Sequence, residues 1–419
     1  MKAKKQLFKL KCLLLLSILL LLINSCAMAT TTLTLLGKFS NWGDSFAQAI
    51  NNFEQKHDVK IEVMDYGDWR VIREKVATMA TGGVYVDVFF ADNRTVGYYA
   101  FNDLAEPLDA LAARDIKLDR YPQVTLNPMR YNGKLYALPV TAGLFNVYYN
   151  PSLFQEAGLP APVSDWTSKK WTWDDFVNSA RKMTVDTNGD GIPDRYGIQS
   201  FGTKGGHNHI GAWGVWFIDN EKPIYYGDRP EVISAYEKTT SLWTVHQVIG
   251  GNFINGTAAM NVVQTGSLNN LVNNRGMVEW LVAAMPLGTQ RATQTGFGGI
   301  AVAKGSKNPE LAWELAKYLA YDTEGTTLIS RAANRLPVLR ETTRDFMNRF
   351  QKILPESSVL SLVDAIAYAY DQRFSRFAYG DEVAQLIVAA GAKVIKGEVS
   401  VREALTSIAP EAKALLEAK

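Results

Sequence analysis

The feature that most constrains the fold of this 419-residue chain is an alternation of strand-like and helix-like stretches that begins at Thr31. The strand-like stretches are short and largely apolar, whereas Phe46, Ala49, Ile50 and Phe53 recur at helical spacing. A strand–helix–strand–helix–strand order predicts a parallel sheet with crossover helices, and therefore an α/β fold. In chain order the stretches are Thr31–Leu36, residues 46–53, Val59–Val63, Trp69–Ala80 and Val84–Phe90.

Polar and aromatic residues gather where these predicted strands end. Ligands of open α/β sheets bind at the carboxyl ends of the strands. Neither a G-x-G-x-x-G fingerprint nor a phosphate-binding P-loop is present there. Trp42 and Trp69 could each belong to the core, but two tryptophans on consecutive strand ends favour a ligand platform. The candidates at these ends are Trp42, Asp44, Tyr66, Trp69, Asp92 and Asn93.

The first residues have the pattern of an export signal. Five lysines with no acidic residue precede the apolar run "LLLLSILLLLI", which is short for a membrane span. We expect residues 1–25 to be a signal peptide, the alternative being an uncleaved N-terminal anchor. The "INSC" segment predicts cleavage before Cys26 and a lipid anchor on that cysteine, whereas "AMA" (27–29) offers ordinary cleavage after Ala29.

Cysteine usage and charge narrow the class of protein further. The only cysteines are Cys12 and Cys26, so the mature chain has neither a disulfide nor a Cys-ligated metal. The formal net charge is +2, and the five leader lysines account for more than that excess. A mildly acidic mature chain argues against a nucleic-acid partner. We expect a monomer, exported to the periplasm or the outer face of the cell membrane and attached only through lipid.

The stretch Tyr131–Phe154, "YNGKLYALPVTAGLFNVYYNPSLF", reads as two strand-like pieces without the turn of a hairpin. Together with later segments, it resembles the sugar-type extracellular solute-binding proteins of bacterial ABC importers, the group that includes maltose-binding protein. The resemblance covers nearly the whole mature chain, and the order and spacing of its segments carry it. They are "YNGKLYALPV", "VYYNPSLFQEAGLPAP", "WTWDDFVNSARKMT", "GTAAM", "GGIAVAKGSKNPELAWELAKYL" and "GEVSVREAL".

The resemblance implies the two-lobed periplasmic-binding-protein fold of type II, with parallel-type sheets, flanking helices and several extended hinge crossings. Pro139–Asn146 would be the first crossing, glycine-rich Gly296–Val302 the second and Leu336–Arg340 the third. Lobe 1 would comprise residues 26–141 and 300–338, and lobe 2 residues 142–299 and 339–419.

The densest aromatic cluster is "GTKGGHNHIGAWGVWF" (Gly202–Phe217). Sugars need flat aromatic faces and planar polar groups, so Trp213 and Trp216 are candidates to cover a ligand, although a pair at i, i+3 can also be core. His207 and His209 form only a weak metal motif, and we expect them in a solvated loop. The predicted carbohydrate site comprises Trp42, Asp44, Tyr66, Trp69, Asp92, Asn93, Trp213, Trp216, Gly299 and Arg335.

A stronger metal motif is "DTNGDGIPD" (Asp186–Asp194), which has oxygen ligands at alternating positions and a glycine at the sixth, as in a calcium loop. Its twelfth position is Gly197 rather than Glu, so the bidentate ligand is missing. The alternative is an ordinary turn. No other cofactor is expected. The candidate structural calcium ligands are Asp186, Asn188, Asp190, Asp194 and the carbonyl of Ile192.

These features predict a non-enzymatic protein that captures a small carbohydrate between two lobes and delivers it to an ABC transporter permease. The chain has neither a G-x-S-x-G elbow nor an H-E-x-x-H motif. Two alternatives stay open at this point: a secreted glycosidase-like enzyme, and a sugar receptor that takes no part in transport.

Overall fold

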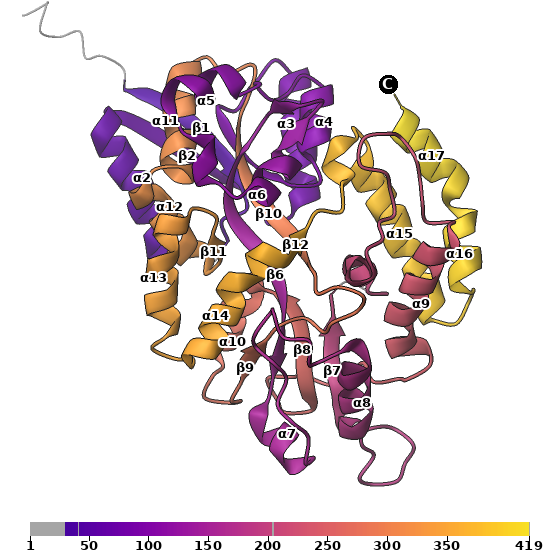
Figure 1. Ribbon diagram of the computed structural model, residues 1–419. Helices are drawn as coiled ribbons and strands as arrows, with labels where there is room; N and C mark the ends of the chain where they lie inside the picture. Colours follow the sequence, from indigo (N-terminus) through magenta and orange to yellow (C-terminus); the bar gives the residue numbers. More distant parts are fainter. Residues whose placement is uncertain (1–29, 41, 203–204, 419) are drawn as a thin grey trace, which may run out of the picture.

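Two long strands organise the computed structural model, which describes residues 30–40, 42–202 and 205–418 (Figure 1). They are β6 (Leu138–Tyr149) and β10 (Thr293–Val302), which lie side by side, antiparallel, in the middle of a sheet with strand order β2-β1-β3-β10-β6-β8-β7. Every residue of β6 is buried. Residues 138–144 of β6 pair with β10, and residues 145–149 pair with β8 and β9, so β6 continues from one part of the sheet into the other.

We call the part around β1, β2 and β3 the first lobe. β1 pairs in parallel with both β2 and β3, which confirms the parallel order predicted from the sequence. Phe46, Ala49, Ile50 and Phe53 form the buried face of α2, also as predicted. The elements of this lobe are β1 (Thr31–Gly37), α2 (Gly43–His57), β2 (Val59–Asp65), α3 (Trp69–Thr81), β3 (Val88–Asp92), α4 (Val96–Phe101), α5 (Asp109–Asp115), α6 (Gln123–Leu126), α11 (Pro309–Ala320) and α12 (Thr323–Ala333).

The part around β7, β8 and β9 is the second lobe, at the bottom and right of Figure 1. One hydrophobic core runs through both lobes, and a second core lies among α9, α15, α16 and α17. The elements of this lobe are α7 (Pro151–Glu156), α8 (Trp173–Met183), β7 (Tyr196–Phe201), the 3-10 helix η3 (His207–Trp213), α9 (Pro230–Thr244), β8 (Ala258–Gln264), α10 (Leu268–Asn273), β9 (Leu281–Ala283), α13 (Arg340–Phe350), α14 (Glu356–Asp364), β12 (Ala369–Tyr370), α15 (Gly380–Ile395), α16 (Val401–Ser407) and α17 (Ala409–Glu417).

The predicted crossings coincide with β6, β10 and the short strand β11 (Leu336–Pro337), which pairs with β6 at Ala142 and Thr141. β10 runs antiparallel to both β3 and β6, so the sheet is mixed where the crossings pass. β10 runs antiparallel to β6 because β6 leads the chain into the second lobe and β10 brings it back to the first. The proposed lobe boundaries at residues 141/142, 299/300 and 338/339 stay a prediction.

Glycines let the two crossing strands approach each other closely. A Cβ atom on Gly143 would lie 2.9 Å from the carbonyl oxygen of Gly296, and one on Gly296 would lie 2.9 Å from Nε2 of Gln264. Both contacts are shorter than a side chain tolerates, so glycine at these positions makes room for the amide of Gln264 beside the crossing.

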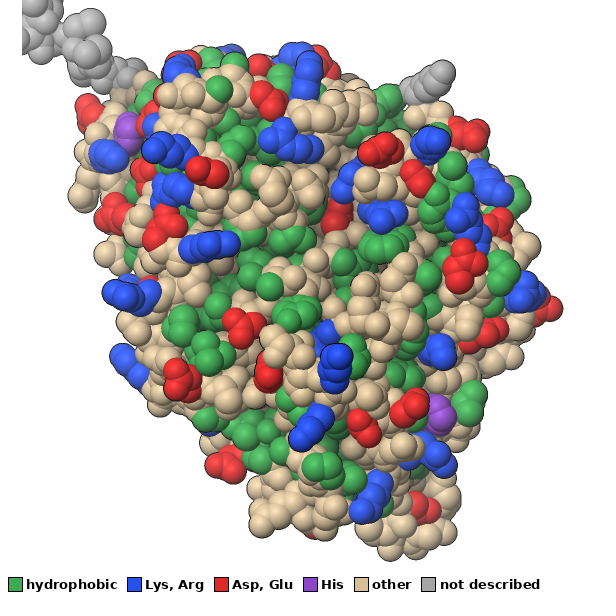
Figure 2. Space-filling view, in the orientation of Figure 1, with side chains coloured by type: hydrophobic (Ala, Val, Ile, Leu, Met, Phe, Trp, Pro, Cys, Tyr) green, Lys and Arg blue, Asp and Glu red, His purple; other side chains and the backbone are tan. Residues whose placement is uncertain are grey.

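The surface carries both signs of charge. Figure 2 shows lysine and arginine side chains interspersed with aspartate and glutamate over the whole visible face. None of the helices in the described part of the chain combines the length and apolarity that a membrane span requires.

The two histidines of the aromatic cluster are buried, not in a solvated loop as expected from the sequence. His207 and His209 are 4% and 3% exposed. The ring of His209 lies 4.2 Å from that of Phe201 and 4.8 Å from that of Phe145, centroid to centroid. Burial lowers the pKa of each imidazole to about 3, so both stay neutral in the folded protein near pH 7.

These buried histidines predict a loss of stability in acid. The folded pKa lies below the unfolded value of 6.5, so the unfolded chain binds more protons and the stabilisation disappears as the pH falls from 6.5 towards 3. Each histidine contributes up to about 1.4 kcal/mol per pH unit in that window. Urea unfolding between pH 7.5 and 4.5 should show this slope, and His209→Phe should make it shallower. Equal slopes for the two proteins would contradict this.

The predicted calcium loop connects α8 and β7 at the foot of the second lobe, far from the crossings (Figure 1). Its side chains accept hydrogen bonds from the loop's own backbone: Asp186 from the N–H groups of Gly189 (2.7 Å) and Gly191 (2.8 Å), and Asp194 from that of Thr187 (2.6 Å). In the part of the chain that the structure describes, no three His, Cys, Asp or Glu side chains group where they could hold a metal. Calcium binding by Asp186, Asn188, Asp190, Ile192 and Asp194 therefore stays a prediction.

Chelation tests that prediction directly. A cation bound only to the native loop stabilises the folded state, so EDTA should lower the melting temperature and calcium should restore it, whereas magnesium should not. Differential scanning calorimetry of the wild type and of Asp194→Asn is the measurement. Superimposable curves with and without chelator would make the loop an ordinary turn held by its own hydrogen bonds.

Candidate functional site

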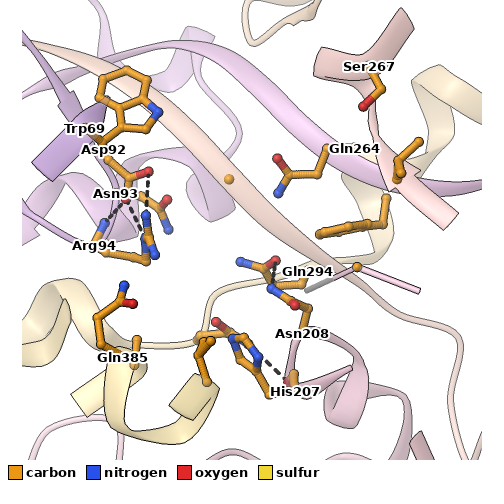
Figure 3. A pocket seen from close by; sticks show the side chains of 17 residues that line it. Trp69, Asp92, Asn93, Arg94, His207, Asn208, Gln264, Ser267, Gln294 and Gln385 are labelled. Atoms are coloured by element: carbon orange, nitrogen blue, oxygen red, sulfur yellow. Dashed lines mark hydrogen bonds and ion pairs between the residues drawn. The ribbon is translucent and has the colours of Figure 1, made fainter. Parts of the chain in front are cut away.

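Two adjoining cavities lie where the lobes meet, against the crossing strands. Cavity A has a volume of about 470 Å³ and is lined by both lobes. Cavity B has a volume of about 540 Å³ and shares Trp69 with cavity A. Figure 3 shows cavity A, with Trp69, Asp92, Asn93 and Arg94 on one side and Gln264, Gln294 and Asn208 on the other. We refer to the two cavities together as the cleft.

Trp42 and Trp69 line the cleft, at the strand ends where the sequence placed them. Trp69 is the first residue of α3, whose start is fixed because the Asp68 carboxylate accepts the N–H of Arg70 (2.9 Å). Trp42 packs edge-on against Phe39, with 5.4 Å between ring centroids, and faces cavity B. Both side chains are half-buried, so each has an aromatic surface available to a ligand.

Asp92 and Asn93 also line cavity A, as the last residue of β3 and the residue after it. Asp92 is paired with Arg94, whose Nε donates to the carboxylate at 2.9 Å. That carboxylate raises the pKa of Arg94 further above its usual range. Asn93 is 4% exposed, and its backbone N–H donates to the carbonyl of Phe297 on β10 (3.0 Å).

The most distinctive chemistry of cavity A is a ring of six carboxamides, of which the sequence predicted only Asn93. Nδ2 of Asn208 donates to Oε1 of Gln294 (3.1 Å), and Nε2 of Gln372 donates to the carbonyl of His207 (3.3 Å). Phe145 of β6 adds an apolar surface. A carboxamide donates and accepts hydrogen bonds, so this lining fits an uncharged, hydroxyl-rich molecule. The six are Asn93, Asn208, Gln264, Gln294, Gln372 and Gln385.

The amides of this ring come from distant parts of the chain, which is why no sequence motif predicts them together. Gln264 ends β8, Gln294 lies near the start of β10, and Gln385 lies on α15. They are far apart in the chain and meet only because the crossings bring the elements together. The one local signal was that Gln264 and Gln294 each occupy a strand end.

Cavity B contains Arg335, the remaining predicted residue that lines the cleft. Arg335 lies between α12 and β11 and is half-buried, and burial lowers the pKa of its guanidinium. Lys38, Ser40 and three asparagines of α10 line the same cavity. The asparagines are Asn269, Asn270 and Asn273.

Five predicted residues line neither cavity, and three of them are Asp44, Tyr66 and Gly299. Asp44 is exposed in the first turn of α2. The ring of Tyr66 faces Lys75, whose Nζ is 5.6 Å from the ring centroid. Gly299 pairs with Ala91 inside the sheet, where an added Cβ would lie 2.6 Å from Sδ of Met129, so this glycine allows packing against the core.

The geometry also does not support a ligand role for Trp213 and Trp216 in the cleft. Trp213 packs edge-on against Trp173, with centroids 5.1 Å apart. Nε1 of Trp216 donates to the carbonyl of Asp371 (3.1 Å), and the guanidinium carbon of Arg373 lies 4.0 Å from its ring centroid. Both side chains are half-buried and each packs against different protein groups, so they do not form the packed core pair that was the alternative either.

The comparisons with known proteins agree with this architecture. A protein of Brucella abortus described as a binding protein is 24% identical over 299 residues, which are 66% of this chain and 68% of the relative. The ABC substrate-binding protein Lmo0181 of Listeria monocytogenes, solved with cycloalternan, has a TM-score of 0.78 at 20% identity and covers 91% of this chain and 98% of its own. UgpB of Mycobacterium tuberculosis, solved with glycerophosphocholine, has a TM-score of 0.76 at 18% identity, covering 93% and 99%.

At these identities the two solved structures establish the two-lobed fold. Membership is established by the sequence model of a family, which matches residues 48–345 and is described as bacterial extracellular solute-binding protein. The chain thus belongs to the bacterial extracellular solute-binding proteins.

Proposed function

We propose that this protein captures a carbohydrate in the cleft and delivers it to the permease of an ABC transporter. The ring of six carboxamides around cavity A is the observation that carries the proposal. A sugar presents hydroxyls that both donate and accept, together with apolar C–H faces. Carboxamides match the hydroxyls, and Trp69, Trp42 and Phe145 offer flat surfaces for the faces. The Listeria protein with this fold was solved with cycloalternan, which also supports a carbohydrate ligand.

Closure of the two lobes around the ligand is the proposed mechanism of capture. A ligand that touches both walls binds the closed form better and shifts the population towards it. Charged groups meet across the same opening: Arg73 Nη1 lies 2.8 Å from Glu382 Oε1, and Arg94 Nη1 lies 3.3 Å from Asp381 Oδ1. These pairs join the first lobe to α15. A permease that contacts both lobes would then distinguish the closed, loaded protein from the open one.

The carboxylates of the cleft favour binding over hydrolysis. A glycosidase of the usual kind needs two carboxylates on either side of the scissile bond. Among the described residues that line the two cavities, Asp92 is the single carboxylate, and it is bonded to Arg94. A sugar receptor without a transport role would have the same cleft, and an uptake defect in a deletion strain would separate it from a transport protein.

Members of this family are exported, and we propose that this one is held at the membrane by lipid on Cys26. The signal peptide (1–25) and Cys26 lie outside the described residues. The support is the "INSC" segment after an apolar run. The protein would then work in the periplasm or at the outer face of the cell membrane, as a monomer.

Binding and closure are testable with one pair of tryptophan variants. A panel of glucose, galactose, mannose, maltose and maltotriose should contain a sugar that changes the intrinsic fluorescence and makes the protein more compact in solution scattering. Trp69→Ala should weaken that binding by roughly 1–3 kcal/mol, or about ten- to a hundredfold, because one large apolar contact is lost. Its melting temperature should change little.

Trp213→Ala is the matched control for Trp69→Ala. It removes a packed side chain away from the cleft, so it should lower the melting temperature and leave sugar affinity intact. The reverse pattern in the two variants would remove the cleft assignment. Release of shorter sugars from maltotriose by the purified protein would promote the glycosidase alternative.

Lipidation predicts the N-terminus of the mature protein. Mass spectrometry of the membrane fraction should find a diacylated or triacylated N-terminal peptide that begins at Cys26. Cys26→Ala should release the protein into the soluble exported fraction. A free N-terminus at Thr30 would instead establish cleavage after Ala29.

A further inference from the structure

Cavity B differs from cavity A in its charge. Arg335 and Lys38 both line it, and no aspartate or glutamate lies among the described residues of its wall. Within the described ranges, neither cation is within ion-pair distance of a carboxylate. Cavity A, by contrast, holds Arg94 already paired with Asp92 (2.9 Å) and close to Asp381 (3.3 Å). The cleft therefore has a charge-balanced half and a positively charged half.

Arg335 is held in position by its backbone. Its N–H donates to the carbonyl of Ser330 (3.2 Å), and the Ser330 hydroxyl donates to the carbonyl of Arg335 (2.7 Å). The preceding residue, Asn334, has a left-handed backbone (φ 46°), and its side chain accepts a bond from Nη1 of Arg349 (2.7 Å) and contacts Asn269. These contacts fix where the side chain leaves the chain.

The guanidinium of Arg335 occupies space that a glycine leaves open. A Cβ atom on Gly266 would lie 3.0 Å from Nη2 of Arg335. Among the described residues no carboxylate lies within ion-pair distance of this half-buried guanidinium, which has lost part of its hydration, and such a loss costs free energy. An anion bound here would recover that cost, and the planar fork of arginine suits the paired oxygens of a carboxylate, sulfate or phosphate.

The polar neighbours can complete such a site. Asn269 and Asn270 line the same cavity, and their Nδ2 groups are donors. Trp69 forms a wall of both cavities, so one molecule can extend from the amide ring of cavity A past this indole into cavity B.

We propose that the ligand is an acidic saccharide, whose anionic group is bound by Arg335 and Lys38 in cavity B while its neutral, hydroxyl-bearing part occupies cavity A. The inference rests on the proposed carbohydrate function and narrows its substrate class. Selectivity for the charge lies in cavity B, because the cation of cavity A is already neutralised by the protein.

The test is isothermal titration calorimetry with matched neutral and acidic sugars. The pairs are glucose with glucuronate and galactose with galacturonate, extended by digalacturonate, glucose 6-phosphate and glucose 6-sulfate to distinguish the anionic groups. The best acidic sugar should bind at least tenfold tighter than its neutral counterpart. Raising the salt concentration from about 50 to about 500 mM should weaken the binding of the acidic sugar more than that of the neutral one, because salt screens charge interactions.

Variants separate a binding role of Arg335 from a structural one. Arg335→Gln should abolish the preference for the acidic sugar, and Arg335→Lys should restore part of it because the charge returns without the fork. The melting temperature of Arg335→Gln should stay equal or rise, since an unpaired, half-buried charge is removed. Arg402→Gln, at an exposed position on α16, is the matched control and should keep the preference.

The possible results distinguish failure of the acidic-ligand proposal from failure of the proposed carbohydrate-binding function. Neutral sugars that bind as tightly as acidic ones, or an acid preference that survives Arg335→Gln, would overturn the acidic ligand and leave the carbohydrate function standing. Inorganic phosphate or sulfate that binds as tightly as any acidic sugar would overturn the saccharide part. No binding by any sugar, acidic or neutral, would overturn the proposed function itself.

Discussion

The hydrogen-bonded pair of strands β6 and β10 is the interaction on which the rest of the structure depends. These strands belong to both lobes at once, so the lobes are joined by a shared sheet and not by a loose linker. Their close approach requires glycine at 143 and 296, and the space so formed admits Gln264. The cleft lies directly against this pair. Its walls are therefore built on a rigid element, while the lobes on either side have only a few crossings to bend about.

The two cavities of the cleft differ in the chemistry of their linings. Cavity A surrounds a ligand with carboxamides and has an arginine that the protein itself neutralises. Cavity B has aromatic and amide walls but leaves two cations unpaired in the described structure. Asp92 stands near the boundary, where it bonds Arg94 and also raises the pKa of Arg335 against the lowering effect of burial. One carboxylate thus bears on the electrostatics of both halves.

The sequence predicted what depends on local pattern and missed what depends on distant contacts. The alternation from Thr31 onward and the positions of Trp42, Trp69, Asp92 and Asn93 followed from strand ends of a parallel sheet. The crossings followed from a family resemblance. Gln264, Gln294 and Gln385 could not be found, because glutamine has no signature spacing and these residues meet only in the folded protein. Trp213 and Trp216 were assigned to the ligand because a tryptophan beside glycines looks alike in a core and in a binding site.

The shared sheet also sets the order in which the chain can fold. β3 receives its second neighbour only when β10 arrives, since Asp92 pairs with Gly298, and most of the second lobe lies between them in the chain. Pairings of such long sequence separation slow folding, because the entropy of closing the loop is lost before the stabilising contacts form. The first lobe thus remains incomplete, with an open strand edge, until three-quarters of the chain is available. While the later segments are still being made, that edge of β3 therefore lacks its partner strand.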